Sequence, residues 1–261
     1  MGGATVEIIS IGNELLMGRT VNTNASWLAD RITRLGGVVR RILVVGDEVD
    51  EVASSIREAC SRRADVVITT GGLGTTPDDR TMEGVARALG VGLELNQEAL
   101  EMLRGKVGRR AEEPHVRKMA YLPQGARPLS NPVGAAPGAL ARLGQTLIVA
   151  LPGVPGEMRA MFELHVEPVI RERARGAYYE EEVALEGVYE ADLAPLIEEA
   201  LREHPQTYVK THPRLEGGRS VIRVHVAKWA ASAEVAREEV EEVVKWLVSQ
   251  AEARGARLAR G

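Results

Sequence analysis

Residues 64–81 read ADVVITTGGLGTTPDDRT, an apolar run predicted to be a buried strand followed by a turn rich in glycine and acids. The next residues, Met82–Leu89, are amphipathic and predict a helix. Glycines at a strand-to-helix turn let the backbone approach a ligand and direct its N–H groups at an anion. Asp78 and Asp79 follow where a metal ion or a phosphate ester would arrive. One loop thus combines an anion cradle with a metal-binding or general-base group, the minimum for phosphoryl chemistry.

Two further strand patterns precede this segment, at residues 6–11 and 38–45. The helix pattern between them has asparagines suited to cap it, Asn22 and Asn24, and a glycine pair that can stop it. A second helix pattern follows residue 48, and we expect Asp50 to be its N-cap. The resulting β-α-β-α-β-α order predicts an α/β fold, with a parallel sheet and helices on both faces.

The middle of the chain is less regular. Helix patterns cover residues 98–103 and 114–119, whereas residues 123–138 hold too many prolines and glycines for a regular element. Residues 146–151 predict another buried strand, and a helix continues from its end to about residue 175.

The pattern changes after Gly176. Strands are predicted at residues 183–188, 207–211 and 220–226, with helices at 192–203 and 232–254. The last two strands flank a turn at Gly217-Gly218. This β-α-β-β-α order predicts a smaller α+β domain, so we expect domains at residues 1–175 and 176–261.

The composition is that of an ordinary globular protein, with 44% hydrophobic and 27% charged residues among 261. The net charge of −4 provides no general attraction for nucleic acid. Cys60 is the single cysteine, so no intramolecular disulfide can form. We expect a cytoplasmic protein, because the sequence has neither a leader-like N-terminus nor an apolar run of membrane-spanning length.

Ligands of open parallel sheets bind beyond the carboxyl ends of the strands. Four polar or glycine-rich segments follow predicted strands and should meet at that edge: Gly12-Asn13-Glu14, Gly46-Asp47-Glu48, Gly71 to Asp79, and Pro152-Gly153-Val154-Pro155. Their convergence predicts a composite site. The histidines show no metal-ligand spacing, and there is no Gly-x-x-x-x-Gly-Lys-Ser/Thr sequence, which argues against zinc and against a P-loop NTPase.

Each piece also has a purely structural interpretation. A glycine pair after a strand can be only a tight turn, and Asp78 or Asp79 can be only a helix N-cap. Asp47 taken alone is more simply a loop acid, and spacing alone favours Asn22 and Asn24 as helix caps. The segment Asn131 to Gly138 is either a stiff surface loop or a binding loop whose prolines fix its shape.

The same segments resemble a known family. Gly12 to Gly18 with Asn22-Thr23-Asn24, the Gly71 to Thr81 loop, Asn131 to Gly138, and Leu151 to Met158 resemble, in family order, the N-terminal domain of CinA competence/damage-inducible proteins. That domain belongs to the molybdopterin-binding superfamily of MogA and MoaB. The resemblance covers about residues 5–172. The remaining part resembles the KH-like domain that follows in CinA proteins.

The resemblance implies a three-layer α/β/α domain with a nucleotide or pterin ligand at the strand ends, and a homodimer. The CinA branch is associated with ADP-ribose pyrophosphatase activity that needs a divalent metal, and the MogA branch binds and adenylylates molybdopterin. By matching position, Asp79 and Asp47 are the expected catalytic residues. Asp79 and its neighbour Asp78 are the expected ligands of the divalent metal, which would be Mg, Mn or Co. The expected ligand-binding residues are Gly12, Asn13, Glu14, Asn24, Gly71, Gly72, Gly74, Thr75, Asn131, Gly134, Pro152, Gly153 and Pro155.

Two features depart from the family pattern. CinA proteins usually have Gly-Pro-Thr where this chain has Gly74-Thr75-Thr76. Bacterial CinA proteins also continue into a nicotinamide mononucleotide deamidase domain that these residues do not contain, so we expect no deamidase activity. A functional KH module clamps nucleic acid with a Gly-x-x-Gly loop between helices. Here Glu216-Gly217-Gly218-Arg219 lies between two predicted strands, so we expect a packing or dimerisation module.

The loop chemistry and the resemblance together predict a metal-dependent hydrolase of a nucleotide diphosphate, and the resemblance implies ADP-ribose as the favoured substrate. Two alternatives stay open: a molybdopterin-binding or molybdopterin-adenylylating protein, and a non-catalytic protein that senses a nucleotide or acts as a scaffold.

Overall fold

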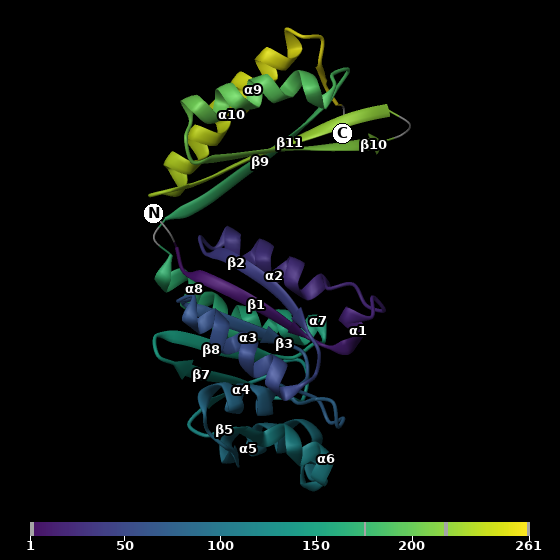
Figure 1. Cartoon of the computed structure of the whole chain (residues 1–261), viewed down its shortest axis with the longest axis vertical. Helices are drawn as coiled ribbons and strands as arrows, with labels where there is room; N and C mark the ends of the chain where they lie inside the picture. Colours follow the sequence, from purple (N-terminus) through teal and green to yellow (C-terminus); the bar gives the residue numbers. More distant parts are fainter. Residues whose placement is uncertain (1–2, 175, 217–218, 260–261) are drawn as a thin grey trace. The chain divides into compact units, whose positions relative to one another are not determined.

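The computed structural model describes residues 3–174, 176–216 and 219–259 (Figure 1). The chain divides into two compact units, Met1–Ala174 and Arg175–Gly261, and each is described by itself. In the described part of the chain, no helix is long and apolar enough to cross a membrane.

The first unit is built on a six-stranded sheet in the order β2-β1-β3-β8-β7-β6. Its strands are β1 (Thr5–Ile11), β2 (Val38–Val45), β3 (Val66–Thr70), β6 (Arg127–Leu129), β7 (Gly138–Leu143) and β8 (Thr146–Leu151). The four strands β2, β1, β3 and β8 run parallel, whereas β7 and β6 are antiparallel. The sheet is therefore mixed, and its parallel part matches the strands expected from the apolar runs.

One part of the sequence-based expectation was wrong. Residues 123–138 were expected to contain no regular element, but β6 pairs with β7 at the edge of the sheet. An edge strand tolerates Pro128, because only one side of the strand has to donate ladder hydrogen bonds. The strand β7 itself was not predicted.

Helices cover both faces of this sheet. They are α1 (Asn13–Leu16), α2 (Thr23–Arg34), α3 (Val49–Ser61), α4 (Thr81–Leu89), α5 (Gln97–Val107), α6 (Pro114–Arg117), α7 (Pro155–Met161) and α8 (Glu167–Arg173). A π-helical turn, η3 (Phe162–Val166), joins α7 to α8. Two short 3-10 turns, η1 (Gly108–Glu112) and η2 (Lys118–Ala120), flank α6, and β4 (Leu93–Leu95) pairs with β5 (Tyr121–Pro123).

Alternate side chains of the strands supply two separate cores. Ile9 packs in a cluster with residues of α3, α4 and α5, whereas its neighbour Ile8 packs with residues of α2, α7 and α8. Successive strand residues point to opposite faces, so two adjacent isoleucines serve two layers. The expected three-layer α/β/α architecture is confirmed.

The helix starts test the expected caps. Asn22 is the N-cap of α2, and its side chain accepts a hydrogen bond from the N–H of Ala25. The expectation for Asp50 was wrong, because α3 begins at Val49 after Glu48, which makes no side-chain capping bond. Asp50 instead lies in the first helical turn and forms an exposed ion pair with Arg87.

The second unit has one antiparallel sheet in the order β10-β11-β9-β12. Its elements are β9 (Ala177–Glu186), α9 (Glu190–Glu203), β10 (Thr207–Glu216), β11 (Arg219–Ala230), α10 (Ala233–Glu252) and β12 (Arg257–Leu258). Both helices share one buried cluster with the sheet, which includes Leu185, Leu196, Val224 and Val243. The expected α+β order is confirmed, with β12 added. The expected turn at Gly217-Gly218 lies outside the described residues.

Candidate functional site

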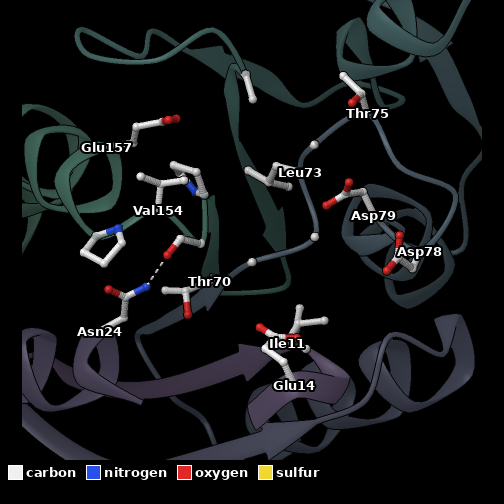
Figure 2. A pocket seen from close by; sticks show the side chains of 18 of the residues that line it. Ile11, Glu14, Asn24, Thr70, Leu73, Thr75, Asp78, Asp79, Val154 and Glu157 are labelled. Atoms are coloured by element: carbon white, nitrogen blue, oxygen red, sulfur yellow. Dashed lines mark hydrogen bonds between the residues drawn. The ribbon is translucent and has the colours of Figure 1, made fainter. Parts of the chain in front are cut away.

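A cavity of about 650 Å³ opens at the carboxyl ends of the parallel strands of the first unit. The ends of β1 and β3, Ile11 and Thr70, line it together with the loops that follow β1, β2, β3 and β8 (Figure 2). The expected site residues that line it are Gly12, Glu14, Asn24, Asp47, Gly71, Gly72, Gly74, Thr75, Asp78, Asp79, Pro152, Gly153 and Pro155. The fold thus brings the four predicted segments to one cavity. Asn13, Asn131 and Gly134 are not among the lining residues.

The glycine loop is held tightly at its start. Thr81, the first residue of α4, donates from its hydroxyl to the carbonyl of Gly71 at 2.8 Å and from its N–H to that of Gly72 at 3.1 Å. Gly72 has a left-handed φ of +63°, and a Cβ there would overlap the Thr81 hydroxyl. Among the described residues, none accepts a hydrogen bond from the N–H groups of residues 72–75. The loop therefore offers a run of unpaired donors at the cavity.

Asp79 closes the same loop. Its Oδ2 accepts hydrogen bonds from the N–H and the hydroxyl of Thr76, at 2.8 and 2.5 Å. A Cβ at Gly74 would lie 2.6 Å from that oxygen, so a glycine is needed for this close approach. The residue before α4 is Arg80, which makes no side-chain capping bond, so neither aspartate is the helix cap that spacing alone allowed. The other oxygen of Asp79, Oδ1, accepts no hydrogen bond from the described residues and can face a ligand.

Asp78 is exposed beside Asp79, and both line the cavity. Hydrogen bonding with Thr76 is the largest cause that lowers the pKa of the Asp78 carboxyl, helped by its own main-chain N–H and the charge of Lys118. The group is therefore ionised at neutral pH and suited to a cation.

Asp47 lines the cavity from the loop after β2. Its Oδ2 accepts a hydrogen bond of 3.0 Å from the main-chain N–H of Asn13. Asn13 thus acts through its backbone on Asp47, and its side chain is not part of the lining.

Asn24 lies across the cavity from Asp78 and Asp79 (Figure 2), and its side chain connects α2 to the loop after β8. Its Nδ2 donates to the carbonyl of Gly153 at 2.7 Å, as Figure 2 shows. Its Oδ1 is buried and has no hydrogen-bond partner among the described residues. Gly153 also packs against Gly71, since a Cβ on Gly153 would lie 3.3 Å from the Gly71 Cα. Asn24 therefore fixes one loop of the cavity, while Asn22 is the cap.

Glu157 is a cavity residue that the sequence did not identify. It lies in the first turn of α7 and accepts a 2.7 Å hydrogen bond on Oε2 from the side-chain amide of Asn131. Glu157 follows the expected Pro155 by two residues. Its position in the first turn of a helix does not by itself show whether the side chain points into the cavity. The lining also includes Arg110, which no predicted segment contained, and Val154, Ala135 and Ala136, which lie within predicted segments but were not expected as ligand-binding residues.

The charges of the lining are unbalanced. The carboxylates are Glu14, Asp47, Asp78, Asp79 and Glu157, whereas Arg110 is the one basic residue among the described lining residues. In residues 3–174, 176–216 and 219–259, no three His, Cys, Asp or Glu side chains are grouped so that they could hold a metal ion by themselves. A cation that binds here must therefore take further ligands from water or substrate.

Comparison with known proteins places this fold in a family. The family model described as "Probable molybdopterin binding domain" matches residues 7–172. Protein PAE0875 of Pyrobaculum aerophilum is 52% identical over 241 residues, which cover 91% of this chain and 89% of that protein. A protein of Aeropyrum pernix is also 52% identical, over 89% of this chain and 88% of its own length.

A solved structure supports the same assignment. The crystal structure of "the protein CinA with unknown function" from Thermoplasma acidophilum is 42% identical, with a TM-score of 0.61. The match covers 64% of this chain and 98% of that one. The chain is therefore similar to CinA, and it belongs to the family of the probable molybdopterin binding domain.

Proposed function

We propose that the protein hydrolyses a nucleotide diphosphate in the presence of a divalent metal ion, with ADP-ribose as the substrate to test first. One observation carries this proposal: unpaired main-chain N–H groups of residues 72–75 and the Asp79 carboxylate belong to one loop and line one cavity. Successive unpaired main-chain N–H groups in a loop can form a concave site that attracts phosphate. A carboxylate within the same loop places a cation ligand beside that phosphate.

The charges of the lining support metal dependence. A diphosphate would approach five carboxylates and one guanidinium, an arrangement that repels it in the absence of a cation. Asp78 and Asp79 would hold a divalent ion, with Asp47 acting on it through a bound water, because carboxylate oxygens suit Mg²⁺ and Mn²⁺. The phosphates and waters would complete its coordination. When bound, such an ion supplies Lewis-acid polarisation of the phosphoryl group and a more acidic water.

The chain's own groups have distinct roles in this proposal. The N–H groups of the glycine loop hold phosphate oxygens without a change in their own conformation, since Thr81 and Thr76 fix the two ends of the loop. The hydrogen bonds to Oδ2 of Asp79 orient its carboxylate. Asn24 holds the opposite wall at Gly153.

The test is an assay of ADP-ribose hydrolysis in the presence of Mg²⁺, Mn²⁺ or Co²⁺. Chromatography detects the products, AMP and ribose 5-phosphate. The decisive variant is Asp79→Asn, because an amide oxygen can still accept both hydrogen bonds from Thr76 while the charge is lost. We expect a decrease in kcat/KM of about 100-fold or more, as for loss of a group that stabilises developing charge. The matched control is Glu101→Gln, an exposed position on α5 outside the cavity. An unchanged rate in Asp79→Asn would refute the mechanism.

A second candidate is binding or adenylylation of molybdopterin, and the description of the matching family as a probable molybdopterin binding domain supports the binding. Parallel titrations of the protein with molybdopterin and with ADP-ribose distinguish these two candidates. Binding of molybdopterin but not of ADP-ribose would refute the proposed ADP-ribose hydrolysis. A third candidate, a nucleotide sensor or scaffold, predicts binding of ADP-ribose without turnover under any of the metals. Product analysis distinguishes this outcome from hydrolysis.

A further inference from the structure

Glu157 is held in place from outside its own helix. A carboxylate in the first turn of a helix is ordinarily free to approach the unpaired N–H groups there. Here the amide of Asn131, which precedes it by 26 residues, donates to Oε2 at 2.7 Å. Figure 2 shows the Glu157 carboxylate on the other side of the cavity from Asp78 and Asp79. The cavity therefore has an oriented carboxylate on the side opposite Asp78 and Asp79.

The side-chain amide of Asn131, which orients Glu157, cannot flip without the loss of hydrogen bonds. Asn131 is 5% exposed, and its Oδ1 accepts from the N–H groups of Val133 and Gly134, at 3.1 and 2.7 Å. Its Nδ2 donates to the carbonyl of Ala136 as well as to Glu157. A flipped amide would place its oxygen against the Glu157 carboxylate and would leave two N–H groups unpaired. The turn thus presents only a donor to Glu157.

Gly134 in the same turn makes room for the carboxylate. A Cβ at this position would overlap the Glu157 carboxyl group. Any larger residue would push Glu157 from its place. Asn131 and Gly134 were expected to bind the ligand, but neither lines the cavity, and both contact Glu157. They are positioning residues.

The surroundings of Glu157 define what it can accept. Oε1 has no hydrogen-bond partner among the described residues, and Val154, Ala135 and Ala136 supply an apolar wall to the cavity. A phosphate would be repelled by the carboxylate, and unpaired N–H groups suited to it lie on the glycine loop. An oriented carboxylate beside apolar side chains fits a neutral group with paired donors, as carboxylates of dinucleotide-binding sites bind ribose hydroxyls.

We propose that Glu157 forms a second subsite of the cavity that recognises the vicinal hydroxyls of a ribose. The Asn131–Gly134 turn builds this subsite. The identity of the ligand rests on the function proposed above. The subsite fixes the orientation of a bound nucleotide, because its phosphate end binds the glycine loop and a sugar end binds Glu157.

The test measures binding without turnover. Isothermal titration with Mg²⁺ compares wild type and Glu157→Gln for the α,β-methylene analogues of ADP-ribose, ADP and 2′,3′-dideoxy-ADP. We expect Glu157→Gln to bind the ADP-ribose analogue about tenfold or more weakly, since a hydrogen bond to a charged acceptor is replaced by a neutral one. Its affinity for the dideoxy analogue should match that of wild type. A loss with the ADP analogue as well assigns the adenosine ribose to the subsite, and a loss with the ADP-ribose analogue alone assigns the terminal ribose.

Two further variants test the positioning role. Gly134→Ala should reproduce the effect of Glu157→Gln, with a loss confined to hydroxyl-bearing ligands, whereas mere damage to the fold would weaken binding of all three equally. The matched control is Glu163→Gln, an exposed position on η3 that does not line the cavity, and its affinities should equal those of wild type.

The outcomes separate this inference from the proposed hydrolysis. An equal loss for the dideoxy analogue, or no loss for any ligand, overturns the subsite while ADP-ribose hydrolysis can still stand. A hydroxyl-selective loss in a protein without turnover supports the subsite and removes the proposed activity. Absence of binding by wild type to all three analogues overturns both.

Discussion

The side-chain amide of Asn24 in α2 donates a 2.7 Å hydrogen bond to the main-chain carbonyl of Gly153, 129 residues further along the chain. Gly153 in turn packs against Gly71, so three segments that follow different strands are joined around one cavity. The contact locks the loop after β8 to the helix after β1. It makes Asn24 a structural determinant of the site, in contrast with Asn22, which caps its own helix.

Asn24→Ala should reduce the free energy of unfolding by about 1 kcal/mol, the typical net value of one hydrogen bond. It should also weaken binding of the ADP-ribose analogue, because the loop of Gly153 loses its anchor. Urea denaturation and calorimetric titration measure the two effects. The matched control is Asn96→Ala, which removes the N-cap of α5 at similar cost and leaves affinity unchanged. Equal affinities of Asn24→Ala and wild type would contradict this role.

Gly72→Ala should destabilise the protein by more than the ordinary cost of a left-handed residue. The control is Gly90→Ala, because Gly90 has a similar φ of +73° and no atom within 4 Å of the place a Cβ would take, whereas a Cβ at Gly72 would meet the Thr81 hydroxyl. We expect about 1 kcal/mol for Gly90→Ala, from backbone strain alone, and at least about 1 kcal/mol more for Gly72→Ala. Thermal unfolding of the two variants measures the difference. Equal losses would show that the clash with Thr81 is relieved without cost.

Removal of divalent cations should reverse the sign of the effect that the Asp47 carboxylate has on affinity for the ADP-ribose analogue. With Mg²⁺, Asp47→Asn should weaken binding of the ADP-ribose analogue, since a carboxylate that attracts the cation into the cavity is lost. With EDTA, the same variant should bind the analogue more tightly than wild type, since one repelling charge has gone. Asparagine can still accept the hydrogen bond from Asn13, so the loop is expected to stay in place. The same sign of change in both buffers would contradict metal-mediated binding.

Glu167 gives the protein a pH-dependent stabilising contact between α2 and α8. Burial acts to raise the pKa of its carboxyl, but the hydrogen bonds and charges of Arg171 and Arg31 outweigh it, and the net shift is downward. Because the folded-state pKa is depressed, the stabilisation is present above the ordinary value of 4.5 and is lost as the pH falls through the lower, folded-state value.

Glu167→Gln should therefore lower the free energy of unfolding by about 1 kcal/mol at pH 7. The difference from wild type should shrink steadily as the pH falls below 4.5, which urea denaturation across pH measures. Glu163→Gln, at an exposed position nearby, should show no such trend. A difference that is constant with pH would show that the ion pairs contribute nothing.

The sequence alone predicted the layers and the place of the site. Apolar runs such as the one that begins residues 66–70 indicate buried strands, because a short uninterrupted run suits a strand that is covered on both faces. Parallel strands then place their carboxyl ends at one edge, so Gly71 to Asp79 and Pro152 to Pro155 were expected to meet, and they line one cavity. The strand at residues 127–129 escaped prediction, since its pairing with β7, rather than its local propensity, makes it a strand.

The orientation of individual side chains was decided only by tertiary structure. Asn131 and Gly134 carry no local sign that they support Glu157, and Asn13 carries none that its backbone holds Asp47. These contacts join residues 23 to 34 positions apart in the chain, and Asn24 contacts Gly153 over a separation of 129. Hydrogen bonds of this range depend on how the layers pack, which no local spacing records. The sequence thus predicted where the cavity would form, and the packed fold determined which groups line and orient it.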